Sequence, residues 1–214
     1  MELNDNKKIN AYCRKIKEAD LQMIMEWRMR DDITKYMNSD PILTLDDQRK
    51  WLKKINDNQN EWHWLLEVDG VPAGVVSLTG FDGNLVHTGV YIAEKSKRSI
   101  KLIVYIQWNL YRFSFDVLKV NKVCEEVFEA NKDVNRILDM CGSKKEGILR
   151  NQVLKKGIFY NIVCRGILKD EWTLVKSKRN YDKIEFELFS QLIDVGSIPN
   201  TIQNVRIYDE KGNV

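Results

Sequence analysis

The fold is decided by one stretch, in which Gly89-Val90-Tyr91-Ile92 is followed by Lys95-Ser96-Lys97-Arg98-Ser99-Ile100-Lys101 and later by Val127-Phe128-Glu129-Ala130-Asn131. These pieces predict a strand, a loop, a long helix and a second strand, because the apolar residues from Leu102 to Val117 recur at helical steps. Asn131 opens a shorter helix that is expected to end at Cys141-Gly142, where glycine is a common helix stop.

Upstream of this stretch, turn signals separate three predicted antiparallel strands. Trp62 to Val68 leads into the hairpin turn Asp69-Gly70, and Ala73 to Phe81 completes the pair. Leu85 to Ile92 is the third strand. Downstream, Glu146 to Leu154 and Ile158 to Leu168 predict a final hairpin.

Helices precede these strands. Ala19 to Met29 has an apolar face at helical spacing, and Asp32 to Met37 predicts a second, short helix. Thr44 to Asp47 is a capping box that starts a third helix. Ala11 to Ile16 predicts a first strand, which its charges place at the edge of the sheet. The order predicts an α+β fold, with a mixed, mostly antiparallel central sheet flanked by helices.

The chain divides into a main domain over residues 1–173 and a C-terminal extension over 174–214. Within the extension, Ile184 to Ile193 predicts a helix and Ile202 to Tyr208 a strand. The extension is too apolar for a simple disordered end. It docks either on its own domain or on a second subunit, and the latter would make a homodimer.

Composition excludes several classes of function. Lys and Arg number 34 and Asp and Glu 31, a net charge of +3, whereas nucleic-acid binders have a larger or more clustered basic excess. We therefore expect no nucleic-acid partner. No apolar run approaches the roughly 20 residues that cross a bilayer, so we expect a cytoplasmic protein with no membrane partner. The four cysteines form no Cys-x-x-Cys pair and only two histidines are present, so no metal site is predicted.

The order of elements from about Tyr12 to Trp172 resembles the GCN5-related N-acetyltransferase (GNAT) family, which transfers the acetyl group of acetyl-coenzyme A (acetyl-CoA) to an amine. The resemblance implies that the strand Gly89 to Ile92 splays from its neighbour. Its backbone at Val90, Tyr91 and Ile92 would then bind the pantetheine arm. It also implies that the loop into the long helix holds the pyrophosphate, since helix N-termini favour anions.

The loop departs from the family pattern, because no glycine occupies the positions where the family has Arg/Gln-x-x-Gly-x-Gly/Ala. In one interpretation the loop still binds the cofactor through its amides, cations and hydroxyls. In the other, cofactor binding is weak or lost. The residues that the first interpretation assigns to the cofactor are Lys97, Arg98, Ser99, Ile100, Lys101 and Asn131.

The catalytic candidates follow from the same resemblance. A tyrosine that protonates the leaving thiolate is common in the family, but the corresponding positions here are Asn135 and Leu138. Asn135 is kept as a catalytic candidate, and leucine cannot donate a proton. His87 is the candidate general base, since its ordinary pKa lies near neutrality; the alternative is a half-buried strand histidine. Glu67 is a second candidate base.

The amine acceptor is expected between the first helices and the strands opposite the cofactor. Arg28 could bind a phosphate through a bidentate contact, or it forms an ordinary surface ion pair. Trp27 is either a stacking platform or a core residue. The residues assigned to the acceptor are Trp27, Arg28, Tyr36 and Thr79.

Three hypotheses follow. Short motifs at Glu26-Trp27-Arg28 and at Glu146-Gly147 with Arg150 resemble the ribosomal-protein and nucleotide-amino-sugar branches of the family. The first hypothesis is therefore an N-acetyltransferase that acts on an amino sugar carried by a nucleotide. The second is acetylation of a protein N-terminus. The third is a catalytically silent binding module, which the missing glycines and the missing tyrosine favour.

Overall fold

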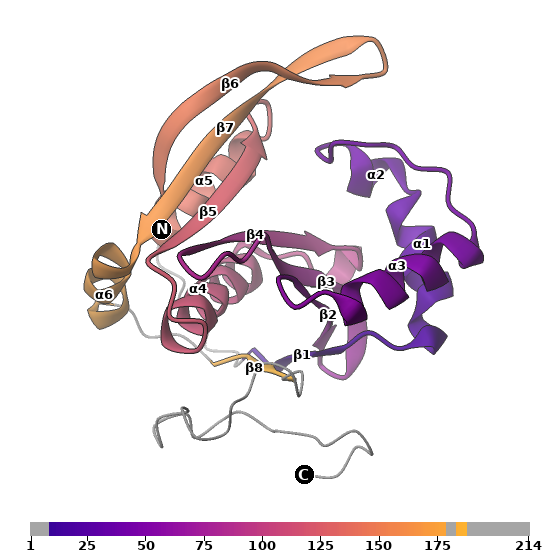
Figure 1. The fold of residues 1–214 in the computed structure, drawn as a ribbon, viewed down its shortest axis with the longest axis horizontal. Helices are drawn as coiled ribbons and strands as arrows, with labels where there is room; N and C mark the ends of the chain where they lie inside the picture. The colour runs from indigo at the N-terminus through magenta and orange to yellow at the C-terminus, as the bar shows by residue number, and fades with distance from the viewer. Residues whose placement is uncertain (1–8, 179–182, 188–214) are drawn as a thin grey trace.

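The computed structural model describes residues 9–178 and 183–187, and in this part of the chain eight strands form one sheet in the order β6-β7-β5-β4-β3-β2-β1-β8. Neighbouring strands are antiparallel except for the pairs β4–β5 and β1–β8. The mixed α+β architecture predicted from the sequence is confirmed (Figure 1). The strands are β1 Ala11–Lys15, β2 Trp62–Val68, β3 Val71–Thr79, β4 Leu85–Ile92, β5 Lys122–Phe128, β6 Lys144–Lys155, β7 Ile158–Leu168 and β8 Glu185–Phe186.

Helices cover both faces of the sheet. They are α1 Leu21–Arg28, α2 Asp31–Thr34, α3 Leu45–Asp57, α4 Ile100–Asp116, α5 Lys132–Cys141 and α6 Lys169–Ser177, with single 3₁₀ turns at Glu18–Asp20 and Lys95–Lys97. The larger core packs α4, α5 and α6 on one face, which carries Trp64 and Val76. The smaller core packs α1 and α3 on the other face, which carries Leu65 and Val75. Consecutive strand residues therefore face different helical layers, as the period of two in a strand requires.

Local chemistry explains several element boundaries. The Thr44 hydroxyl accepts a hydrogen bond from the Asp47 amide at 3.2 Å and the Asp47 carboxylate accepts one from the Thr44 amide at 2.9 Å, so the predicted capping box is confirmed. Asp69 and Gly70 both have positive φ, which closes the β2–β3 hairpin with the primed turn expected of this pair. Gly142 ends α5 in the left-handed conformation, as predicted.

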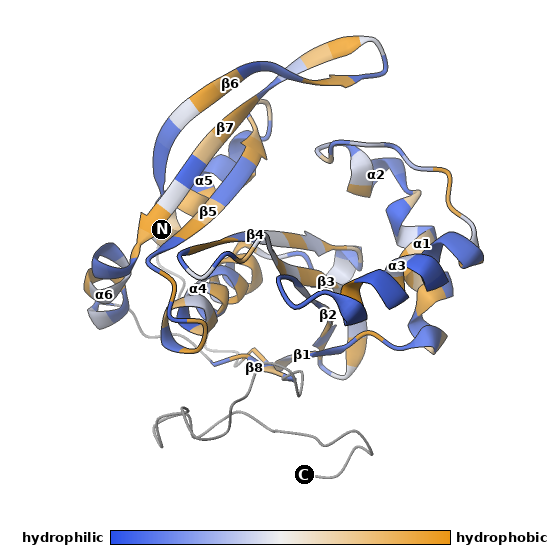
Figure 2. Ribbon diagram, viewed as in Figure 1, coloured by the Kyte–Doolittle hydropathy of each residue, from blue (hydrophilic) through white to orange (hydrophobic). Residues whose placement is uncertain are grey.

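Burial follows the amphipathic pattern of the helices. The interior side of α4 is largely apolar from Leu102 to Phe115 but also buries Gln107, Asn109 and Ser114, whereas α3 is hydrophilic over most of its visible length (Figure 2). None of the described helices is long and apolar enough to cross a bilayer.

The C-terminal segment returns to the sheet. Ile184 and Phe186 are buried, and β8 pairs in parallel with β1, so the helix predicted over Ile184 to Ile193 is wrong for the part that the structure describes. β8 forms because its backbone completes the hydrogen bonds of β1, which no local pattern encodes. Because β8 pairs with its outer side, β1 is not the edge strand of the sheet, which corrects the expectation drawn from its charges. The rest of that helix and the strand predicted over Ile202 to Tyr208 lie outside the described residues.

The predicted boundary after residue 173 falls inside α6, and Trp172 of this helix is buried in the larger core. The division into a domain and an extension stays a prediction, as does a homodimer formed through the extension.

Candidate active site

A V-shaped separation of two parallel strands organises the site. β4 and β5 pair at three positions only, which end with His87 opposite Cys124. Beyond that point β4 remains paired with β3 and β5 with β7, so the two halves of the sheet diverge (Figure 1). Among the described residues, no strand pairs with Thr88–Ile92 on the side that faces β5. The predicted splayed strand is therefore present.

Along β4, the backbone N–H and C=O groups of successive residues point alternately toward β3 and toward this opening. The Ala93 amide donates to the Ala73 carbonyl of β3 at 2.7 Å, so the alternate residues Val90 and Ile92 direct their backbone groups away from β3. The Ile92 carbonyl confirms this direction, because the Arg98 guanidinium reaches it from outside the sheet at 2.8 Å. Val90, which lies beyond the last β4–β5 pair, thus presents its backbone groups to the V.

The N-terminus of α4 lies at the wide end of the V, directly after the loop that follows β4. Ser99 caps this helix by accepting a hydrogen bond from the Leu102 amide at 3.1 Å. The helix continues for 17 residues, so its dipole is fully developed at Ile100. A hydroxyl cap followed by first-turn amides is an anion-binding arrangement that needs no glycine.

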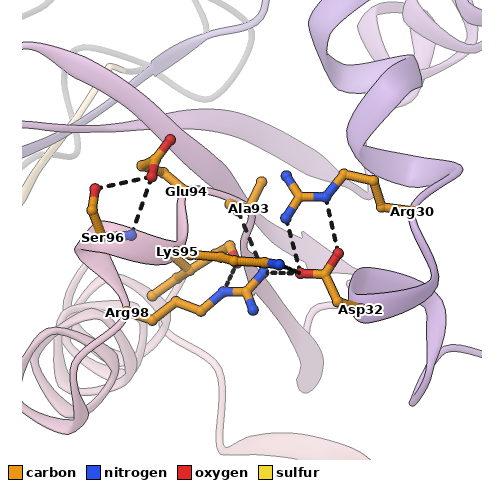
Figure 3. A network of polar contacts seen from close by, with 8 residues as sticks. Arg30, Asp32, Ala93, Glu94, Lys95, Ser96 and Arg98 are labelled. Carbon is orange, nitrogen blue, oxygen red and sulfur yellow. Dashed lines mark hydrogen bonds and ion pairs between the residues drawn. The ribbon is translucent and has the colours of Figure 1, made fainter.

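The cations of the loop are largely engaged with protein groups. Arg98 donates to the carbonyls of Ile92 and Ala93 and to Asp32 of α2, at 2.8, 3.3 and 2.7 Å (Figure 3). Arg30 approaches Asp32 from the other side, and hydrogen bonds from Arg30 and then Arg98 hold the pKa of this carboxyl well below its usual range. Arg98 therefore ties the loop to α2 in this structure.

The two lysines of the predicted cofactor set differ in their surroundings. Lys97 forms an ion pair with Asp69 of the β2–β3 turn at 2.9 Å. The ammonium group of Lys101 lies 5.8 Å from the centroid of the Tyr105 ring, on the first turn of α4. Of the predicted cations, Lys101 is thus the one placed at the helix N-terminus itself.

The far wall of the V is formed by β5 and the start of α5. Asn131 caps α5 by accepting a hydrogen bond from the Val134 amide at 3.4 Å. Asn135 donates its side-chain amide to the carbonyls of Phe128 and Asn131, at 3.1 and 2.9 Å, while its Oδ1 is buried without a partner. Leu138 is buried and supplies no proton donor.

The predicted acceptor residues lie on several elements, with Trp27 and Arg28 on α1, Tyr36 after α2 and Thr79 on β3. Trp27 packs against the smaller core with Tyr91, whose hydroxyl is buried and has no hydrogen-bond partner. Burial raises the pKa of Tyr91, and the nearby Arg28 opposes this shift. Arg28 also contacts the sulfur of Met37. The ring of Tyr36 lies 6.3 Å from that of Phe128 across the V.

The two candidate bases occupy different places. His87 lies at the apex of the V, opposite Thr79 of β3 and Cys124 of β5. Glu67 lies on β2, where Arg14 donates to its carboxylate at 2.7 Å. The structure therefore brings His87 to the apex of the V, whereas Thr79 lies one strand away on β3 and Glu67 lies two strands away on β2.

The sequence from residue 12 to residue 144, more than half of the chain, matches the model of the acetyltransferase (GNAT) domain. The chain belongs to the GNAT family of acetyltransferases. A curated relative, the SPbeta prophage-derived uncharacterized N-acetyltransferase YokL of Bacillus subtilis strain 168, is 25% identical over 130 residues, which are 59% of this chain and 72% of that protein.

Solved structures share the GNAT fold. The spermidine N-acetyltransferase from Vibrio cholerae, in complex with CoA and spermine, has a TM-score of 0.68 at 18% identity, covering 76% of this chain and 98% of that one. A GNAT acetyltransferase from Bacillus anthracis has a TM-score of 0.65 at 15% identity, covering 77% and 98%. At these identities the likeness shows the fold alone.

As a GNAT member, this protein is an acyltransferase that takes its acetyl group from acetyl-CoA. Family membership thus favours the enzyme over the silent module. The residues present fit this donor, because the unpaired backbone of β4 leads directly to the capped N-terminus of α4.

Substituting the two cations separately should distinguish their roles. We expect Lys101→Ala to weaken acetyl-CoA binding with little change in Tm, because Lys101 stands at the helix N-terminus. We expect Arg98→Ala to lower Tm by about 2–4 °C, since it loses charge-assisted hydrogen bonds worth about 1 kcal/mol net. Calorimetric titration and thermal denaturation measure the two effects. Equal loss of acetyl-CoA affinity in both variants, without a change in Tm, would contradict the assignment of cofactor binding to Lys101 and of loop anchoring to Arg98.

Proposed function

We propose that this GNAT enzyme acetylates the primary amine of an amino sugar carried on a nucleotide, with acetyl-CoA lying along the free edge of β4. The observation that carries the proposal is the divergence of β4 from β5 after His87 and Cys124, which leaves the Val90 backbone without a strand partner on the strand that leads to the N-terminus of α4. Such an edge suits the amides of the pantetheine arm, and the helix N-terminus suits its diphosphate.

The proposed chemistry is direct transfer. The amine nitrogen forms a bond to the thioester carbon, the carbon–sulfur bond breaks, and one amine proton is lost. The Val90 amide donates to the carbonyl oxygen, where negative charge develops. His87 accepts the amine proton, and solvent protonates the leaving thiolate, because Leu138 cannot.

Charge around the acceptor side supports an anionic rather than a polycationic acceptor. Three carboxylates of α2 and the loop after it already have basic partners: Asp31 pairs with Lys156, Asp32 with Arg30 and Arg98, and Asp40 with Lys155. A polyamine, the substrate class of the Vibrio cholerae enzyme, would have to compete with these partners. Arg28 lies beside the Tyr91 hydroxyl and could instead bind a phosphate.

Aromatic side chains add a second feature that suits a nucleotide sugar. The rings of Tyr36, Phe128 and Tyr160 form a chain across the V, with centroid separations of 6.3 and 5.4 Å. Phe128 is buried, so the half-buried rings of Tyr36 and Tyr160 are the ones available to stack on a sugar or base ring. A protein N-terminus remains the alternative acceptor that the branch resemblance suggests.

A substitution at Arg28 tests the acceptor class. We expect Arg28→Ala to raise KM for a nucleotide-linked amino sugar about 10-fold or more, since a charge-assisted contact contributes roughly 1.5–3 kcal/mol. KM for acetyl-CoA should change little. The measurement is steady-state kinetics with nucleotide amino sugars, spermidine and a peptide as acceptors.

Arg49→Ala is the matched control, because Arg49 is an exposed arginine of α3 that pairs with Glu18 and Asp46. It removes the same charge away from the V and should leave both KM values unchanged. Faster turnover of spermidine than of any nucleotide sugar, unaffected by Arg28→Ala, would contradict the proposed acceptor.

A further inference from the structure

A buried polar cluster lies on the α4 side of the V, at the point where β4 and β5 separate. Its centre is Glu125 of β5, whose side chain accepts hydrogen bonds from Tyr111 at 2.5 Å and from Gln107 at 3.1 Å. Ser143 donates to the second carboxylate oxygen at 2.8 Å, and Arg165 lies nearby. Glu125 is only 4% exposed, and burial raises its pKa. A carboxyl group in the core is unusual and needs such partners.

Gln107 connects this cluster to β4. Its side-chain amide donates to the Thr88 hydroxyl at 3.2 Å as well as to Glu125. The last backbone pair between the strands is His87 with Cys124, and Thr88 and Glu125 are the next residues along each strand. A side-chain bridge therefore replaces the backbone ladder at the first position where the strands have separated, and it closes the narrow end of the V.

The direction of the cofactor follows from the geometry already described. The diphosphate belongs at the N-terminus of α4, beside the Ile92 end of β4. From there the arm runs along the free edge toward Thr88, a distance of about 13 Å at the rise of a strand. The acyl group, at the end of the arm, is thereby directed to the narrow end of the V.

We infer that Thr88, Gln107 and Glu125 form a floor that receives the acyl end of the acyl-CoA and restricts the enzyme to short acyl groups such as acetyl. The hydrogen bonds of Gln107 hold the three side chains together, so a longer acyl chain would have to displace buried, hydrogen-bonded groups. The inference rests on the proposed placement of acyl-CoA along β4, and it does not depend on the identity of the amine.

Calorimetric titration of the full chain with CoA, acetyl-CoA and butyryl-CoA tests the floor without requiring turnover. We expect wild-type protein to bind acetyl-CoA at least about 10-fold more tightly than butyryl-CoA. Gln107→Ala removes the side-chain amide that forms the bridge, and we expect it to reduce this preference about 10-fold, since a difference of one methylene in the ligand changes the selectivity of a pocket by roughly 10-fold or more. Affinity for CoA, which has no acyl group, should stay within about threefold.

Three further variants sharpen the result. Thr88→Ala opens the floor from β4 and should shift the preference in the same direction. It keeps the test available if Gln107→Ala fails to fold. Gln107→Met keeps the volume without the polar atoms and should keep the preference for acetyl. Asn109→Ala is the structural control, because Asn109 is a buried amide of the same helix that bonds to Tyr105 and Ile184 instead.

The outcomes separate the claims. A shift in Gln107→Ala or Thr88→Ala, with none in Asn109→Ala, supports the floor. An unchanged acetyl-to-butyryl ratio in both folded variants overturns it, as does an equal shift in Asn109→Ala, which would indicate general loosening. Failure of the wild type to bind CoA at all would overturn the cofactor placement on which the inference rests, whereas CoA binding with an unchanged ratio leaves that placement intact.

Discussion

Replacing Val90 with proline is expected to lower kcat/KM for the best amine acceptor by about 100-fold or more. Proline removes the backbone N–H that faces the V, and loss of one such donor to a developing oxyanion costs about 10²–10³ in rate. The fold should survive, because the Val90 backbone points away from β3 and proline is tolerated where a strand amide has no ladder partner.

Val90→Ala is the matched control for this experiment. It removes side-chain contacts with the larger core but keeps the N–H group. Its kcat/KM should stay within a few-fold of the wild type, with circular dichroism confirming that both variants are folded. A folded Val90→Pro variant with nearly normal kcat/KM would show that this amide does not polarise the thioester.

Gly74→Ala is expected to destabilise the protein by about 3 kcal/mol or more, which corresponds to a fall in Tm of roughly 6–12 °C. Gly74 is the β3 partner of Ile92 in β4. A Cβ at this position would lie 2.1 Å from the Tyr91 carbonyl oxygen and 2.9 Å from the Ile92 Cα. Both contacts are with backbone, so β4 itself must move.

Displacement of β4 should also weaken acetyl-CoA binding, because the cofactor edge is the opposite side of the same strand. Gly147→Ala provides the comparison, since a Cβ there meets no atom within 4 Å. We expect that variant to change the unfolding free energy by less than about 1 kcal/mol. Thermal denaturation of the two variants measures the difference, and equal Tm values would contradict the close approach of β3 and β4.

Sequence reasoning predicted the elements whose cause is local. The Thr44 capping box, the Asp69-Gly70 turn and the Gly142 helix stop each depend on the chemistry of a few neighbouring residues, and all three are confirmed. β8 could not be predicted in this way, because its two residues form a strand only by pairing with β1. Ile184 and Phe186 fit either a helix face or a strand face when read alone.

The site was predictable only in outline. The splayed strand and the helix start were expected from the family resemblance, but the engagement of Arg98 by Asp32 joins residues 66 positions apart. Glu125 was missed because β5 carries two adjacent acids, Glu125 and Glu126, and the sequence gives no signal of which one is buried. Its burial becomes apparent only when Gln107, Tyr111 and Ser143 converge on it from other elements.

Hydrogen–deuterium exchange of the full chain, with and without saturating acetyl-CoA, tests most directly whether the V between β4 and β5 is the cofactor site. The structure predicts that acetyl-CoA slows exchange within Thr88–Ile92 and in the first turn of α4, from Ile100 to Ile103. Val90 and Ile92 direct their backbone groups to the opening, and Ile100 to Ile103 form the first turn of α4, where the diphosphate is proposed to bind. Slowed exchange confined to other segments, or no change at saturation, would contradict the site.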